Sequence, residues 1–246
     1  MRRFYAAPES FSETKIYLSE EESRHLRDVL RLREGEAVSV FDGVGREFAC
    51  LVERAGRKNE SAELRIQEEV APPASESDLN LTLAVALLKG EKFDLVVQKA
   101  TELGVKRIVP LQTKRADVRL KDEKDSAKKI ERWRRIALEA AKQSGRAFVP
   151  EIENPADFEI FVKNSNFPGI FFAERGGDNL QAGLTQISSS NLIAVTGAEG
   201  GWEDAEIELA RKNDFRVVTL GGRILRAETA AITVAALLQH LSGDLR

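Results

Sequence analysis

From Leu79 onward the sequence alternates between short apolar runs and stretches in which apolar residues recur at helical spacing. The run LNLTLAVALL at 79–88 is almost continuously apolar, which is typical of a strand covered on both faces. The stretches 91–103 and 126–146 have helical spacing and end near a glycine, as helices do. Further strands are expected at 105–111, 169–174, 191–197 and 215–221. Strand alternating with helix predicts an α/β fold with a parallel sheet.

The chain before Pro73 has a different pattern, in which apolar and polar residues alternate over short runs. Runs at 37–42, 46–55 and 61–70 are expected to be strands, and a turn at Asp42 to Gly45 joins the first two. Pro72, Pro73 and the polar residues after them separate the two patterns. We therefore expect a β-rich domain at 1–72 and an α/β domain at 73–246.

One helix is expected within the β-rich domain, at 20–32. Ser19, with Glu22 three residues later, has the pattern of a capping box at its start. At helical spacing, Leu26, Val29 and Leu30 would share one buried face.

Composition excludes several classes of protein. Of the 246 residues, 42% are hydrophobic and 31% charged, as in folded rather than disordered chains. No apolar run is long enough to span a membrane and the N-terminus lacks the apolar core of a signal peptide, so we expect a cytoplasmic protein. Cys50 is the only cysteine, and His25 and His240 are the only histidines, so neither a disulfide nor a metal site is expected.

Charge is distributed unevenly along the chain. The formal net charge is −3, yet residues 89–147 carry an excess of Lys and Arg, whereas residues 148–246 carry an acidic excess. The basic segment 114–146 could contact nucleic-acid phosphates. A charge run on a helix is, taken alone, more often a solvated face.

Three glycine-containing loops follow the last three apolar runs. They read AERGGD at 173–178, TGAEGGWEDAE at 196–206 and LGGRILRAETA at 220–230. Loops after parallel strands meet at one edge of the sheet, where α/β proteins bind ligands, and glycine lets the backbone approach a ligand closely. The loops lack the G-x-G-x-x-G and G-x-x-x-x-G-K-[ST] motifs, so nicotinamide cofactors and nucleoside triphosphates are not expected. We expect one shared ligand pocket.

Several motifs spread over the whole chain carry a family resemblance. They are VTGAEGGW at 195–202, LGGRILRAETA at 220–230, residues 89–111 and 131–146, the opening MRRFY, and HLRDVLRL at 25–32. Together they resemble the RsmE family of 16S ribosomal RNA (uracil-N3) methyltransferases, in the SPOUT superfamily. The resemblance implies an N-terminal PUA-like β-barrel that binds RNA and a C-terminal SPOUT α/β domain with a deep trefoil knot. It also implies S-adenosylmethionine as the methyl donor, a homodimer, and methylation of N3 of a uridine in the 16S rRNA of the small ribosomal subunit.

The resemblance assigns a set of residues to the methyl donor. They are Ala173, Glu174, Thr196, Gly197, Glu199, Gly200, Gly201, Leu220, Gly221, Arg223, Ile224, Leu225, Arg226, Thr229 and Ala230. Proline is more usual in the family where this chain has Ala198 and Gly222, so these loops are expected to be less preorganised.

Arg226 and Glu228 are the candidate catalytic residues. Uracil N3 must lose a proton on methylation, so a nearby cation would stabilise the anionic base and a carboxylate could accept the proton. Arg226 would serve the uracil or a flanking phosphate, and Glu228 would either take the proton or cap the helix. The helix dipole alone also favours an acid in the first turn of a helix, so capping is the alternative role for Glu228.

The resemblance places another set of residues toward RNA: Arg2, Arg3, Phe4, His25, Arg31, Arg115, Arg134 and Arg146. Arginine would grip phosphate and Phe4 would stack on a base. A mobile terminus or a partly buried helix histidine would explain Arg2, Arg3 and His25 equally well. Trp133 lies on the apolar face of its helix and is expected to pack in the core.

A second function remains open from the sequence. An RNA-binding ribosome assembly factor could keep this fold without catalysis. The intact polar residues of the donor loops favour the enzyme, and titration with S-adenosylmethionine would separate the two.

Overall fold

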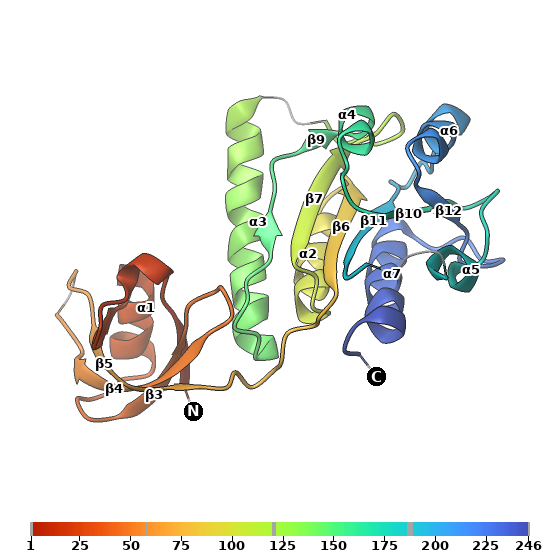
Figure 1. Cartoon of the computed structure of the whole chain (residues 1–246). Helices are drawn as coiled ribbons and strands as arrows, with labels where there is room; N and C mark the ends of the chain where they lie inside the picture. The colour runs from red at the N-terminus through yellow and green to blue at the C-terminus, as the bar shows by residue number, and fades with distance from the viewer. Residues whose placement is uncertain (1, 58, 120–121, 186–188, 246) are drawn as a thin grey trace. The chain divides into compact units, whose positions relative to one another are not determined.

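The structure is a computed structural model that describes residues 2–57, 59–119, 122–185 and 189–245 (Figure 1). Met1 of the opening motif and residues 120–121 of the basic segment lie outside the described residues. The chain divides into two units: the first consists of Met1–Glu76 and Ala141–Val149, the second of Ser77–Ala140 and Pro150–Arg246. The expected division at 72/73 did not include the returning segment Ala141–Val149.

The first unit is built on a five-stranded sheet. Its strands are β1 (Arg2–Tyr5), β2 (Lys15–Tyr17), β3 (Ala37–Phe41), β4 (Glu47–Arg54) and β5 (Glu63–Val70), and a short 3-10 turn, η1 (Pro8–Ser10), follows β1. The order is β1-β3-β4-β5-β2, with β1 parallel to β3 and the other neighbours antiparallel. The three predicted strands are confirmed as β3, β4 and β5, whereas β1 and β2 were not predicted. Within the described residues the sheet is open, because no ladder joins its edge strands β1 and β2.

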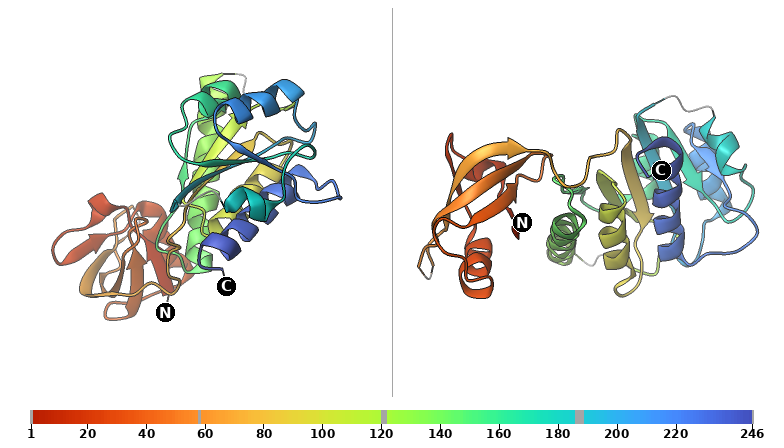
Figure 2. Two further views of the ribbon diagram at one scale, coloured as in Figure 1. Left: turned by 45° about the vertical axis from the view of Figure 1, so that its right-hand side comes forward. Right: turned by 90° about the horizontal axis from the view of Figure 1, so that it is seen from below.

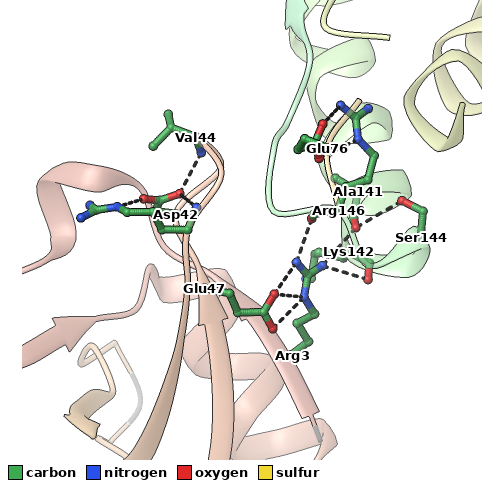
Figure 3. Close-up of polar contacts among 10 residues, drawn as sticks. Arg3, Asp42, Val44, Glu47, Glu76, Ala141, Lys142, Ser144 and Arg146 are labelled. Carbon is green, nitrogen blue, oxygen red and sulfur yellow. Dashed lines mark hydrogen bonds and ion pairs between the residues drawn. The ribbon is translucent and has the colours of Figure 1, made fainter. Parts of the chain in front are cut away.

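Asp42 holds the predicted turn between β3 and β4. Its Oδ1 accepts hydrogen bonds from the backbone N–H groups of Val44 at 2.9 Å and Arg46 at 3.0 Å, and its Oδ2 accepts one from Arg46 Nε at 2.9 Å (Figure 3). The carboxylate is fully buried. This local bonding of an acid to the backbone two and four residues on is what makes the stretch turn.

The helix expected at 20–32 begins as predicted but then changes pitch. Ser19 Oγ accepts a hydrogen bond from the N–H of Glu22 at 3.3 Å and precedes α1 (Glu20–Arg24). The chain continues into a π-helical turn, η2 (His25–Val29), which widens the helix by one residue. Val29 is thereby rotated into solvent and is 69% exposed, so the prediction that it shares the buried face with Leu26 was wrong.

A hydrophobic core lies between η2 and the first sheet. Its buried members are Phe4, Ala6, Ile16, Leu18, Leu26, Leu32, Val38, Val40, Phe48, Cys50, Val52, Ala62 and Leu64. Burial raises the pKa of the Cys50 thiol to about 12. The single cysteine of the chain is therefore an inert part of the core.

The second unit contains a parallel sheet, as predicted. Its strands are β6 (Asn80–Ala86), β7 (Arg107–Gln112), β8 (Glu151–Ile152), β9 (Ala156–Asp157), β10 (Gly169–Phe172), β11 (Asn191–Thr196) and β12 (Arg216–Val218). They are ordered β12-β10-β11-β6-β7-β8, and β9 also pairs with β7. Every one of these pairings is parallel. The short strands β8 and β9 were not predicted.

Helices cover both faces of this sheet. They are α2 (Lys92–Glu102), α3 (Glu123–Ser144), α4 (Phe158–Lys163), α5 (Leu180–Leu184), α6 (Asp204–Lys212) and α7 (Ala227–Ser242). α2 and α7 pack together on one face, with α3 beside α2 (Figure 2). On the other face, α4 and α6 add Phe158, Val162, Ile207 and Ala210 to a core that contains Trp202. The helices predicted at 91–103 and 126–146 are confirmed as α2 and α3, and α7 is the helix whose first turn was expected to hold Glu228, whereas α4, α5 and α6 were not predicted.

Trp133 joins α3 to α2. Its ring lies 4.3 Å from that of Phe93, centroid to centroid, and its Nε1 donates to Asp94 Oδ1 at 3.0 Å. The side chain is buried, which confirms the expected core position. Among the helices formed by described residues, none combines the length and apolar character needed to cross a membrane.

Candidate functional site

The carboxyl ends of β10, β11 and β12 meet at one edge of the second sheet. β10 lies between β11 and β12, and β11 is next to β6, so the segments that follow these strands are neighbours. Together with the start of α2 they enclose a cavity of about 500 Å³. Its lining residues are Lys92, Phe172, Ala173, Glu174, Gly197, Ala198, Glu199, Gly200, Gly201, Trp202, Thr219, Leu220, Gly221, Arg223, Ile224, Leu225, Arg226, Ala227 and Ala230. The three glycine-containing loops therefore share one pocket, as expected.

The first and third loops are bound to each other through their backbones. The N–H of Asp178 donates to the carbonyl of Val217 at 3.0 Å, and the N–H of Thr219 donates to the carbonyl of Asp178 at 2.9 Å. Gly177 permits this approach, because a Cβ there would lie only 2.6 Å from the carbonyl carbon of Val218. One wall of the cavity thus depends on a close backbone crossing.

Trp202 fixes the far end of the second loop. Its Nε1 donates to the carbonyl of Phe172 at 2.9 Å, and its ring lies 4.4 Å from that of Phe171, centroid to centroid. The side chain is only 1% exposed. Gly201, just before it, has a φ of +68°, a conformation that favours glycine. The loop is therefore anchored to β10 by a buried aromatic residue.

Most residues that the resemblance assigned to the donor line the cavity. The exceptions are Thr196 and Thr229, and Thr196 is buried at the end of β11. Lys92, Phe172, Ala198, Trp202, Thr219 and Ala227 line the cavity although they were not assigned to it. The roles of all these residues stay predictions.

Charged groups of both signs line the cavity. Lys92 Nζ donates to Glu199 Oε1 at 2.9 Å, and the backbone N–H of Lys89 donates to the same oxygen at 3.4 Å. Burial acts to raise the pKa of Glu199, but the hydrogen bonds from Lys92 and Lys89 outweigh it and the pKa is lowered. On the first loop, Glu174 pairs with Arg175 at 2.8 Å. The cavity lining thus contains carboxylates as well as the cations Lys92 and Arg226. This combination suits a ligand that has both positive and negative groups.

The start of α7 carries the two candidate catalytic residues. Arg226 is exposed, lines the cavity and stands at the N-cap position, where its side chain makes no capping hydrogen bond. Glu228 is not among the lining residues, although its neighbours Ala227 and Ala230 are. Its side chain is 12% exposed, and its Oε2 is buried with no hydrogen-bond partner in the described part of the chain.

Arg3 and Phe4, two of the residues expected to bind RNA, make contacts within the first unit instead. Arg3 donates to Glu47 through Nε and Nη2, to the carbonyls of Ala141 and Lys142 through Nη1, and to that of Arg146 through Nη2 (Figure 3). These bonds use all five donors of the guanidinium group and satisfy carbonyls at the end of α3. Phe4 is completely buried and has no face for a base. The predicted RNA contacts are therefore wrong for Arg3 and Phe4.

Arg146, another residue expected to bind RNA, forms a buried ion pair within the first unit. Its Nε lies 3.0 Å from Glu76 Oε1 and its Nη2 lies 2.6 Å from Glu76 Oε2, a bidentate ion pair (Figure 3). Only 3% of the residue is exposed. The predicted RNA contact of Arg146 is contradicted by this burial, because a paired and buried guanidinium group cannot reach a phosphate.

The other RNA candidates remain accessible. Arg31, Arg115 and Arg134 are exposed, and Arg115 also donates to the carbonyl of Gly200 at 3.3 Å. Arg2 is exposed and pairs with Glu36 at 3.1 Å. His25 is half-buried and meets the edge of the Phe4 ring at 6.0 Å, centroid to centroid. No group of three or more potential metal ligands occurs among the described residues.

Two family models match the sequence. One, an RNA methyltransferase domain, matches residues 75–239, and the other, an RNA methyltransferase PUA domain, matches residues 18–65. The first match contains all the cavity loops, and the second lies within the first unit.

Curated relatives and solved structures agree with these matches. Ribosomal RNA small subunit methyltransferase E of Synechocystis is 34% identical, over 97% of this chain and 77% of the relative, and that of Rickettsia conorii is 32% identical, over 98% and 96%. A Legionella pneumophila methyltransferase solved with bound S-adenosylmethionine is 34% identical, with a TM-score of 0.88 over 99% of this chain and 98% of that one. Methyltransferase E from Neisseria gonorrhoeae, bound to S-adenosylmethionine, is 33% identical, with a TM-score of 0.86 over the full length of both chains.

Proposed function

Since the chain belongs to the family of ribosomal RNA small subunit methyltransferase E, we propose that it methylates N3 of a uridine in 16S rRNA with S-adenosylmethionine as the donor. The main support for this proposal is that the three glycine-containing loops, which hold the residues assigned to the donor, line one shared cavity. Two relatives with the same fold were solved with that donor bound.

The cavity suits this donor in size and chemistry. Its volume of about 500 Å³ lies within the range of small-molecule pockets. Glycines of the second loop expose backbone donors and acceptors, and Glu174 and Glu199 place carboxylates on the wall. S-adenosylmethionine, when bound, would supply an activated methyl group on a cationic sulfur. A carboxylate-bearing wall attracts such a cation.

The protein's own part in the reaction is to orient the uracil and to manage one proton. The N3–H bond would break, with its proton going to a base, and the freed electron pair of N3 would form the new bond to the methyl carbon. The methyl–sulfur bond of the donor would break at the same time, with its electron pair staying on sulfur, so that neutral S-adenosylhomocysteine leaves. Arg226 is proposed to stabilise the negative charge that develops on the uracil. Glu228 is proposed to take the proton through one water molecule, because its buried Oε2 has no hydrogen bond that a proton would displace.

The partners of the reaction follow from the same proposal. Exposed Arg31, Arg115 and Arg134 are proposed to contact rRNA phosphates, so RNA affinity should fall with added salt. The small ribosomal subunit as substrate, a homodimer, a cytoplasmic location and a trefoil knot in the second unit are also part of the proposal.

Mass spectrometry of rRNA nucleosides tests the proposed function. The protein is incubated with methyl-labelled S-adenosylmethionine and either small ribosomal subunits or naked 16S rRNA, and the RNA is digested to nucleosides. We expect the label in 3-methyluridine. Label in another nucleoside would contradict the assigned atom. RNA binding without donor binding, measured by calorimetric titration, would favour the assembly factor.

Arg226→Ala is expected to lower the single-turnover methylation rate by about 10- to 100-fold, as expected when one charged hydrogen bond to the transition state is lost. The donor is kept saturating, so that weaker binding does not contribute. Arg216→Ala is the matched control, because this exposed arginine on β12 lies outside the cavity. Full activity in Arg226→Ala would show that the assigned role is wrong.

A further inference from the structure

Three charged side chains from separate elements meet at the cavity. Lys92 begins α2, Glu199 lies in the second loop, and Glu228 lies in the first turn of α7. Lys92 Nζ is 2.9 Å from Glu199 Oε1 and 3.9 Å from Glu228 Oε2. One ammonium group therefore faces two carboxylates and links the loop to the helix that carries Arg226.

The second loop needs such a link because it has few side chains with which to pack. Glu199 is flanked by Ala198 and Gly200, and Gly201 follows. Trp202 holds one end of the loop, and Arg115 donates to the carbonyl of Gly200 at 3.3 Å. A glycine-rich backbone has wide conformational freedom, so these anchors decide where its N–H groups point. Glu199 provides the anchor toward α2.

We propose that Lys92 is a positioning residue for the methyl donor, acting through Glu199 to hold the backbone of residues 197–201 in place. The inference rests on the proposed function, since it takes the ligand of the cavity to be S-adenosylmethionine. A loop that is free to move must be ordered when the donor binds, which weakens binding. Loss of Lys92 therefore lowers donor affinity more than it lowers the rate at saturating donor.

Calorimetric titration of the full chain with S-adenosylmethionine tests this role. Lys92→Met is expected to weaken binding by about fivefold, the upper end of what a partly exposed ion pair contributes. Glu199→Gln should weaken it at least as much, because it also removes a carboxylate from the cavity wall. The double variant should be no weaker than Glu199→Gln alone, because loss of Glu199 already removes everything that Lys92 does through it. Lys92→Arg should stay within about threefold of wild type, since a guanidinium group can reach the same carboxylate. In methylation assays, KM for the donor should rise while kcat changes by less than about threefold.

Lys89→Met is the matched control. The Lys89 ammonium pairs with Asp117 at 2.7 Å, and only its backbone N–H contacts Glu199, so this variant should bind the donor as wild type does. Wild-type affinity in Lys92→Met, or losses that add in the double variant, would overturn the role of Lys92. A wild-type protein that binds no donor would instead refute the proposed function. If Lys92→Met unfolds at a lower temperature than wild type, donor binding by Lys92→Arg and Glu199→Gln provides the test instead.

Discussion

Glu228→Gln is expected to lower kcat for methylation by about 100- to 10,000-fold, the usual contribution of a positioned general base. The amide that replaces the carboxylate has nearly the same shape but cannot accept the N3 proton. Glu228 Oε2 is buried without a hydrogen-bond partner among the described residues, and the nearest ammonium group, Lys92 Nζ, is 3.9 Å away. The rate is measured in single turnovers at saturating donor and RNA, so that it reports the chemical step.

The same variant separates catalysis from helix capping. If Glu228 only favours the dipole of α7, neutralising it would cost about 0.3–1 kcal/mol of stability and would leave activity intact. Thermal stability is therefore expected to stay close to that of wild type while the rate collapses. Activity within about threefold of wild type would assign Glu228 to the helix start and leave the base to be found elsewhere.

Gly177→Ala is expected to destabilise the second unit by about 2–3 kcal/mol, because the new methyl group overpacks the crossing of the first and third loops. Its Cβ would lie 2.6 Å from the carbonyl carbon of Val218 and 2.8 Å from the nitrogen of Thr219. These are backbone atoms and cannot move aside as a flexible side chain can. The loops must separate, which also opens the cavity wall at Thr219. Both tryptophans, Trp133 and Trp202, lie in the second unit, so tryptophan fluorescence during denaturation reports this loss directly.

Gly222→Ala is the control for this change. It lies in the third loop, and a Cβ there meets nothing within 4 Å. Its unfolding free energy should stay within about 0.5 kcal/mol of wild type, as for an ordinary surface substitution. Equal stability of the two variants would mean that the crossing tolerates a methyl group and that the cavity does not depend on Gly177.

Hydrophobic patterning predicted the elements that are long or strongly periodic. Residues 79–88 and 191–197 became neighbouring parallel strands, because an apolar run buried on both faces has few alternatives. The strands β8 and β9 have two residues each and leave no periodicity to detect. Val29 was misplaced because nothing in the spacing of a short helix distinguishes the α-helical from the wider π-helical turn.

The sequence predicted the part of the site that is formed by loop backbone. It did not predict the contacts that long side chains make. Glycines in loops after successive strands located the cavity, since the parallel topology brings those loops together. Arg3 and Arg146 were misassigned because charge alone does not say whether a partner comes from RNA or from the chain itself. Their partners, Glu47 and Glu76, are far from them in sequence. Lys92 was missed for the same reason, because its contact with Glu199 exists only once the sheet has formed.

The return of Ala141–Val149 to the first unit has a consequence during synthesis. Arg3 leaves the ribosome long before the carbonyls of Ala141, Lys142 and Arg146 that it will bind. At a translation rate of about 5–20 residues per second, the N-terminal sheet waits on the order of several seconds for its missing segment. During that interval the Arg3 side chain has Glu47 and the Phe41 ring as partners but lacks the three carbonyls. The N-terminal sheet therefore gains these contacts only when much of the second unit has also been made.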